Sequence, residues 1–129
     1  MALVRVPASF LVAERDSSLR QVLAEITAET FPSATVYSAQ DETEALATLP
    51  RLRPPCVAVL HWSLLDEGSA TLALFQAAGV PVLLTSAWDS ATIAEAGPAR
   101  RLKKPFELHD YVACLQELLA AWPAPGKPD

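Results

Sequence analysis

The chain has 129 residues, a length that suits one domain with a hydrophobic core of its own. Hydrophobic residues make up 51% of the sequence and there are only 4 glycines, which argues against a disordered chain. Charged residues make up 19%, a low share that suggests some apolar surface reserved for a partner. The net charge of −5 disfavours direct binding of nucleic acid, because such binding needs a basic face to displace counterions from phosphate.

Neither the start of the chain nor its cysteines indicate an exported or membrane protein. Arg5, Pro7 and Glu14 interrupt the apolar residues of the first stretch, so it offers neither a signal peptide nor the roughly 20 apolar residues of a membrane helix. Cys56 and Cys114 have no CxxC or histidine spacing around them, so we expect two buried, reduced thiols. We therefore expect a cytoplasmic protein that does not contact a membrane.

Short apolar runs predict the strands of a sheet. In chain order, strands are expected at residues 9–13, 34–39, 57–60, 80–85 and 101–103. The segment from Val57 to Leu60 is continuously apolar, which is typical of a strand buried on both faces of a parallel sheet. His61 follows at once, so this strand delivers a polar side chain to one edge of the sheet.

Helical patterns lie between these strands. The first helix follows Ser17, and one face of it carries Leu19, Val22, Leu23 and Ile26. The second is expected over residues 42–49, because Asp41 and Glu44 have the spacing of a reciprocal cap. Pro50 then closes this helix.

The three remaining helices differ in length. Residues 69–78 predict a short helix that ends at Gly79, a residue suited to a left-handed cap. Residues 91–96 allow only about two turns before Gly97 breaks the pattern. A long amphipathic helix begins at residue 108, where apolar residues recur at helical spacing: Leu108, Tyr111, Val112, Leu115, Leu118, Leu119 and Trp122.

Strands that alternate with helices predict an α/β domain over residues 1–122, with a five-stranded parallel sheet and helices on both faces. Residues 123–129 are polar and rich in proline, and we expect them to form a disordered tail. The flavodoxin-like strand order 2-1-3-4-5 places the first and third strands side by side. The acidic residues after the first strand would then face His61 at the switch point, where ligands bind in such sheets.

Four segments share their order and spacing with one known family: FLVAERDSSLRQVL, SAQDETEAL, LLTSAWD and LKKPF. Over nearly all of residues 9–121, the chain resembles the receiver domain of two-component response regulators. In that family Ser86 would be the switch hydroxyl and Lys104 the lysine that precedes a proline. The resemblance implies a CheY-like fold and a cis peptide bond between Lys104 and Pro105.

The sequence departs from the receiver pattern at the place where that family accepts phosphate. His61 falls on the position of the phosphoacceptor aspartate, and Arg15 falls where a second metal-binding carboxylate is usual. Arg101 stands where an aromatic switch residue is common. The resemblance therefore indicates a degenerate pseudo-receiver, whose pocket comprises Glu14, Arg15, Asp16, His61, Ser86 and Lys104.

These departures change the chemistry of the pocket. Phosphoryl transfer to a carboxylate needs an oxygen nucleophile and a hard cation, and Mg²⁺ prefers octahedral oxygen ligands. Arg15 and Lys104 instead bring fixed positive charges, and we expect Lys104 to form an ion pair with Glu14 in place of a metal. We expect neither a metal nor a cofactor here.

Several roles stay open for the residues around the pocket. His61 suits a neutral, hydrogen-bonded side chain, a phosphohistidine, a metal ligand or a pH sensor. Asp66 and Glu67 suit a displaced phosphoacceptor or metal site, or a solvated loop. Trp62 and Trp88 each follow a strand end, where an aromatic side chain covers the pocket or contacts a partner.

We expect a signalling module rather than an enzyme. The first hypothesis is a pseudo-receiver that binds a signalling protein, or a second copy, through its fourth helix, fifth strand and last helix, independently of phosphorylation. The second is a phosphorelay receiver that uses His61 or Asp66 as its acceptor, and the third is a small-ligand binder at the switch point. The candidate interface residues are Arg100, Arg101, Lys103 and Tyr111.

Overall fold

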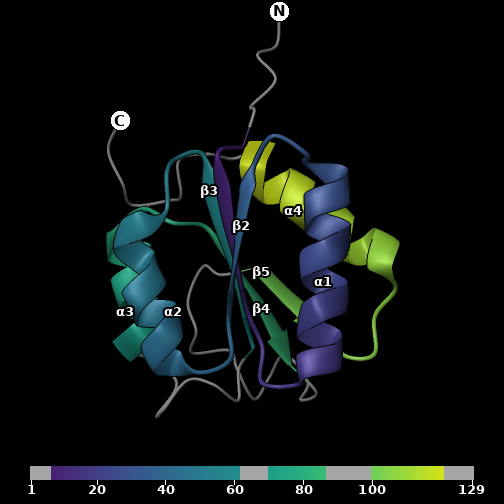
Figure 1. Ribbon diagram of the computed structural model, residues 1–129, viewed down its shortest axis with the longest axis horizontal. Helices are drawn as coiled ribbons and strands as arrows, with labels where there is room; N and C mark the ends of the chain where they lie inside the picture. The colour runs from purple at the N-terminus through teal and green to yellow at the C-terminus, as the bar shows by residue number, and fades with distance from the viewer. Residues whose placement is uncertain (1–6, 62–69, 87–99, 121–129) are drawn as a thin grey trace, which may run out of the picture.

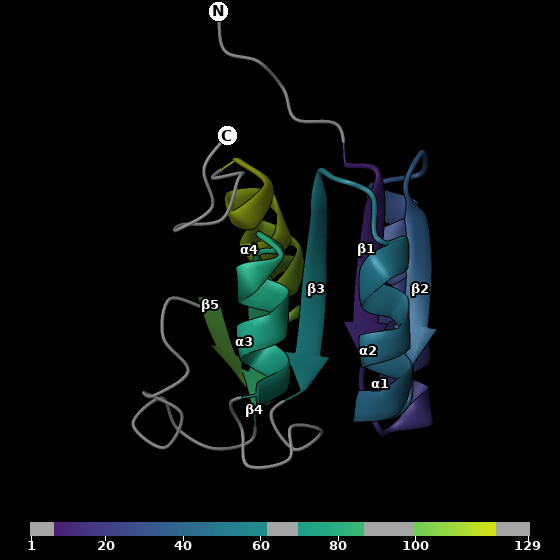
Figure 2. The same ribbon diagram turned by 90° about the vertical axis from the view of Figure 1, so that its left-hand side faces the viewer.

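The computed structural model describes residues 7–61, 70–86 and 100–120. They form a five-stranded parallel sheet in the expected order β2-β1-β3-β4-β5, and the carboxyl ends of all strands lie at one edge (Figure 2). The strands are β1 (Ser9–Ala13), β2 (Thr35–Ala39), β3 (Cys56–His61), β4 (Val82–Ser86) and β5 (Arg100–Lys103). The strand expected at residues 80–85 therefore begins and ends later than the apolar run suggested.

Helices cover both faces of this sheet (Figure 1). They are α1 (Ser17–Thr30), α2 (Glu42–Thr48), a 3-10 helix η1 (Leu49–Arg51), α3 (Ala70–Ala77) and α4 (Leu108–Ala120). The α-helix ends just before Pro50, as expected, and Pro50 itself stands in the first turn of η1, where a missing N–H costs nothing. The helix expected over residues 91–96 and the tail expected over 123–129 lie outside the described residues.

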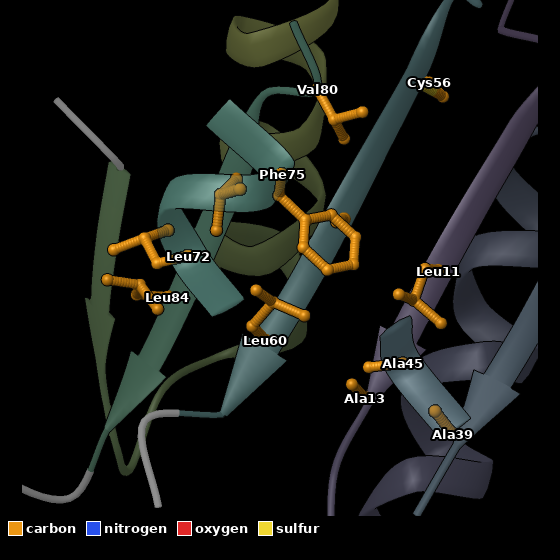
Figure 3. Close-up of a cluster of buried hydrophobic side chains, with 12 residues drawn as sticks. Leu11, Ala13, Ala39, Ala45, Cys56, Leu60, Leu72, Phe75, Val80 and Leu84 are labelled. Atoms are coloured by element: carbon orange, nitrogen blue, oxygen red, sulfur yellow. The ribbon is translucent and has the colours of Figure 1, made fainter. Parts of the chain in front are cut away.

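The sheet separates two hydrophobic cores. Figure 1 shows α1 and α4 on one face of the sheet and α2 and α3 on the other. Every residue of β1 and β4 is buried, because both strands have a neighbour on each side and helices above and below. In the core beneath α2 and α3, Phe75 and Leu72 point toward Leu60 and Leu84 of the strands (Figure 3).

The second core contains a buried polar link between α1 and α4. The Tyr111 hydroxyl lies 2.8 Å from Thr27 Oγ1. Because the Thr27 hydroxyl donates its one proton to the carbonyl of Leu23 at 2.6 Å, Tyr111 is the donor in this pair. Burial raises the pKa of Tyr111, although the bond to Thr27 opposes that shift. The bond satisfies the phenol without access to water.

Two side chains expected on helical apolar faces are exposed instead: Val22 and Leu108. Helical periodicity alone does not decide burial at such positions, and Leu108 is the first residue of α4. Tyr111 is a correction in the opposite sense, because its side chain is fully buried and gives a partner nothing to contact. Tyr111 belongs to the apolar repeat of α4, and this position buries the side chain despite its polar hydroxyl.

The helix starts follow the predicted chemistry. The Glu44 N–H donates to Asp41 Oδ1 at 2.8 Å, and the Glu44 carboxylate accepts from the N–H of Gln40 at 2.9 Å. Cys56 and Cys114 are buried free thiols, as expected, and burial raises the pKa of Cys56 to about 11. Among the residues described, no helix has both the length and the apolar character that crossing a membrane requires.

Candidate functional site

Strand register brings the predicted pocket residues to the carboxyl edge of the sheet. Ala13 pairs with Leu60, so the next residues on these neighbouring strands are Glu14 and His61. On the other side of β3, His61 pairs with Thr85. This edge is the switch point of the fold, because β1 and β3 lie side by side while their connections leave in opposite directions.

Glu14 is the charged centre of this pocket. Its side chain is only 4% exposed, and its Oε1 lies 2.8 Å from Lys104 Nζ. Its Oε2 accepts the backbone N–H of Asp16 at 3.0 Å. The ion pair that the sequence predicted is therefore present, and the carboxylate has a donor on each oxygen. A buried carboxylate needs such partners, because an unpaired charge in the interior is costly.

Lys104 is held in place by the chain around it. Its backbone N–H donates to the carbonyl of Ser86 at 2.6 Å, which continues the pairing of Ser86 with Lys103 beyond the end of β5. The Lys104–Pro105 peptide bond is cis, as the resemblance implied. Ser86 is itself buried at the end of β4, so the predicted hydroxyl lies at the same edge as Lys104.

His61 lies beside this ion pair. Its Nε2 is 4.0 Å from Glu14 Oε1, and its side chain is 12% exposed. Desolvation lowers the pKa of His61 below its ordinary value of 6.5; Glu14 opposes this shift, and the charges of Lys104 and Arg15 add to it. The neutral imidazole is therefore favoured near neutral pH.

Two further residues predicted for the pocket, Asp16 and Arg15, have exposed side chains. The Asp16 carboxylate accepts the N–H of Leu19 at 3.0 Å and caps α1, so it is exposed and directed to the helix rather than to Glu14. Arg15 is exposed as well, and it acts on His61 through its charge. The chain turns between Glu14 and Ser17, the first residue of α1, and this turn places Asp16 at the helix start.

Sequence reasoning missed Arg20, which braces the same turn. Its Nη1 donates to the carbonyl of Glu14 at 2.8 Å and lies 3.4 Å from the carbonyl of Arg15. The carbonyls of Glu14 and Arg15 lie in the turn after β1 and need hydrogen-bond donors. Arg20 stands one helical turn into α1, close enough for its side chain to reach both carbonyls. No short motif in the sequence marks this contact.

A second missed contact joins the two helices on the other face. The hydroxyl of Thr71, near the start of α3, donates to the carboxylate of Glu42, the first residue of α2. Both helices begin at the carboxyl edge of the sheet, so this hydrogen bond lies on the same side of the molecule as the pocket. The Glu42 carboxylate at this edge is therefore already hydrogen-bonded within the chain.

The described residues do not fit the Mg²⁺ site that the receiver resemblance implies. That site needs several oxygen ligands around one cation. Glu14 is already bonded to the ammonium of Lys104, Asp16 caps α1, and the residue at the end of β3 is His61, whose imidazole offers no oxygen ligand. In the part of the chain described, no group of three or more His, Cys, Asp or Glu residues is placed to hold a metal. Asp66, Glu67, Trp62 and Trp88 lie outside the described residues.

The basic cluster predicted at an interface lies on the outer strand β5. Arg100 and Lys103 are exposed, and Arg101 is partly exposed. Arg100 Nη2 lies 3.4 Å from the carboxylate of Glu117 on α4. The cluster therefore spans the junction of β5 and α4, but Tyr111 does not belong to it because its side chain is buried in the core.

The chain is similar to several solved receiver structures. A Francisella response regulator receiver domain matches with 25% sequence identity and a TM-score of 0.73, covering 87% of this chain and 96% of its own. The chemotaxis response regulator CheY4 of Vibrio cholerae matches with 22% identity and a TM-score of 0.74, covering 87% and 98%. A response regulator receiver protein of Sinorhizobium medicae matches with 15% identity and a TM-score of 0.76, covering 89% and 96%.

These neighbours share the architecture of this chain over nearly its whole length. No protein-family model matches the sequence, and no curated protein matches it. The chain thus has the CheY-like receiver fold of two-component response regulators.

Proposed function

We propose that this chain acts in two-component signalling as a receiver-like protein-interaction module that works without phosphorylation. The observation that carries the proposal is the 2.8 Å ion pair between Lys104 and Glu14. Phosphoryl transfer needs a cation held by oxygen ligands and positive charge beside the phosphoryl group, and in this pocket Glu14 and Lys104 are the residues that could supply them. Here each neutralises the other, and an imidazole takes the place of the attacking carboxylate.

The pocket accordingly has a structural role in this proposal. Two opposite charges about 4 Å apart attract by about 4 kcal/mol at an effective dielectric of 20, before desolvation is subtracted. The pair joins the residue after β1 to the residue after β5 across the carboxyl edge of the sheet, so in this proposal it holds that edge in one conformation. In this proposal the edge keeps that conformation without an added phosphoryl group.

The proposed binding surface is the junction of β5 and α4. Arg101 and Lys103 place positive charge on a chain whose net charge is −5, which suits a partner with an acidic patch. Complementary charge of this kind chiefly sets the association rate and the register of the complex. The molecule would bind without catalysing a reaction.

A second candidate is a phosphorelay receiver with His61 as acceptor. The lowered pKa of His61 favours it, because a neutral imidazole nitrogen is the nucleophilic form. The ion pair weighs against it, because Lys104 is already bonded to Glu14 and an incoming phosphoryl group would have to displace that bond.

Partner capture under two conditions tests the proposal. The immobilised chain is offered cell extract with and without acetyl phosphate and Mg²⁺, and the affinity of each captured, identified protein is then measured with purified components. We expect equal affinity in both conditions and a loss of at least about tenfold for Arg101→Glu. Arg53→Glu, a charge reversal at an exposed residue before β3, is the matched control. Capture that requires acetyl phosphate would contradict the proposal.

A further inference from the structure

The two outer strands of the sheet are built differently. They lie at opposite edges (Figure 2). Strand β5, with sequence RRLK, carries positive charges, a common protection of an edge against pairing with another chain. Strand β2, with sequence TVYSA, has no charge and no proline, and it pairs with β1 residue by residue without a bulge. The usual protections of an edge are therefore absent from the residues of β2 itself.

The outer side of β2 presents backbone groups that can accept another strand. The N–H of Thr35 and the C=O of Ala39 both bond across to the chain of β1, each at 3.0 Å. Backbone groups alternate in direction along a strand, so those of Tyr37 also face β1 and those of Val36 and Ser38 face outward. No strand in the described ranges 7–61, 70–86 and 100–120 pairs with this edge.

A groove runs along the same edge. It has a volume of about 460 Å³ and lies between α1 and the side chains of Val36 and Ser38. The α1 wall is a stripe that begins at Ser17 and ends at Ala28. Arg20 and Glu25, two charges of opposite sign, both belong to this stripe, and each lies three residues from one end of it.

We propose that a second copy of this chain binds here, with β2 of each copy pairing antiparallel across a two-fold axis at Tyr37. In this register Val36 of each copy lies opposite Ser38 of the other. Such a pair exchanges two N–H···O=C bonds in an antiparallel ladder. The register therefore satisfies the outward-facing N–H and C=O groups of both residues in both copies, and it joins the two sheets into one.

The side chains around this axis are self-complementary, as a two-fold interface requires. Tyr37 would lie directly opposite its symmetry mate as a non-hydrogen-bonded pair, a position in which aromatic pairs stabilise a sheet. It is partly buried, with Arg51 placed 5.0 Å from its ring, so it is already ordered. The two α1 stripes would run in opposite directions, so each copy brings both a positive charge, Arg20, and a negative charge, Glu25, to the interface.

Sedimentation equilibrium of the full chain over a wide concentration range tests this proposal. We expect a reversible monomer–dimer equilibrium in the wild type. Ser38→Pro removes an outward N–H without touching the bonds to β1, so it should weaken dimerisation by at least about tenfold. Ser38→Ala keeps that N–H and is the matched control, which should dimerise like the wild type.

Two further measurements keep the test decisive if Ser38→Pro fails to fold. Ser38→Lys places on β2 the kind of charge that protects β5, and it should also favour the monomer. Amide hydrogen exchange of the wild type should show protection at Val36 and Ser38 that increases with protein concentration. A wild type that stays monomeric, or a dimer whose β2 amides and affinity are unaffected by these changes, would overturn the proposal. Arg101→Glu should leave the monomer–dimer equilibrium unchanged. This result would show that the dimer interface at β2 is distinct from the proposed partner surface at β5 and α4.

Discussion

Strand β5 has an ion pair at each of its ends, and the two differ mainly in their surroundings. At its start, Arg100 lies 3.4 Å from Glu117, with side chains 49% and 57% exposed. Just after its end, Lys104 lies 2.8 Å from Glu14, with side chains 23% and 4% exposed. Water screens the first pair, whereas the second sits where Glu14 has lost most of its water.

This difference shows what each pair can do. An exposed pair contributes about 0–1 kcal/mol to the free energy of unfolding and is weakened further by salt. Such a pair therefore has little effect on the stability of the fold. In a buried pair, the loss of one partner leaves the other as an uncompensated charge, so the two residues become mutually dependent. The pocket of this chain is of the second kind, and the predictions below measure how far the two pairs differ.

Lys104→Met should have the largest effect. It leaves Glu14 buried and without its cation, and the free energy of unfolding should fall by about 3–5 kcal/mol. The combined variant Lys104→Met with Glu14→Gln removes both charges and should recover a large part of that loss. Urea denaturation of the four proteins of this double-mutant cycle measures the coupling. A coupling near zero would mean that the pair is screened like the one at Arg100.

Tyr111→Phe tests a buried contact that has no charge. It removes the hydrogen bond from Tyr111 to Thr27 while Thr27 keeps its bond to Leu23, so no buried donor loses its acceptor. The free energy of unfolding should fall by about 1 kcal/mol, measured by urea denaturation. A loss as large as that of Lys104→Met would show that burial matters here more than charge.

The pH dependence of stability tests the place of His61 beside the buried pair. The folded pKa of His61 lies below its ordinary value of 6.5, so the unfolded chain binds the proton more readily. The stability that His61 contributes is therefore present above pH 6.5 and is lost as the pH falls from 6.5 through the folded pKa.

Urea denaturation at several pH values, for the wild type and His61→Gln, should show this loss only in the wild type. His109→Gln, which changes an exposed histidine of α4, is the matched control and should follow the wild type. A wild type that gains stability relative to His61→Gln as the pH falls would reverse the sign and place a protonated His61 in the ion pair.

Arg100→Ala should have the smallest effect. Its partner Glu117 is exposed and regains water, so the change in the free energy of unfolding should be about 0.5 kcal/mol or less. Denaturation at low and high salt checks this, because the small difference from the wild type should shrink as salt is added. A loss above about 2 kcal/mol would mean that this pair is not screened.

Much of the fold follows from patterns that sequence displays directly. The continuous apolar run from Val57 to Leu60 predicts a strand buried on both faces, and the spacing of Asp41 and Glu44 predicts a helix start. Alternating strands and helices then restrict the topology to a few arrangements. The pair of Lys104 with Glu14 was predictable only because the resemblance assigned both residues to one edge of the sheet.

Other contacts depend on geometry that no local pattern encodes. Asp16 could point to Glu14 or cap α1, and the exact turn of the chain decides for the cap. The sequence allowed Tyr111 either at the surface or in the core. It lies in the core because Thr27 of the neighbouring helix is close enough to accept a hydrogen bond from its hydroxyl. Arg20 reaches the carbonyl of Glu14 through a tertiary contact that leaves no spacing signature.

In our proposal the pocket of this chain is satisfied by its own residues and takes no phosphoryl group. The decisive measurement is the intact mass of the wild type after incubation with acetyl phosphate and Mg²⁺, with a receiver that retains its aspartate treated in parallel. We expect an unchanged mass for this chain, while the parallel receiver gains one phosphoryl group. A gain of one phosphoryl group here, mapped to His61 or Asp66, would contradict it.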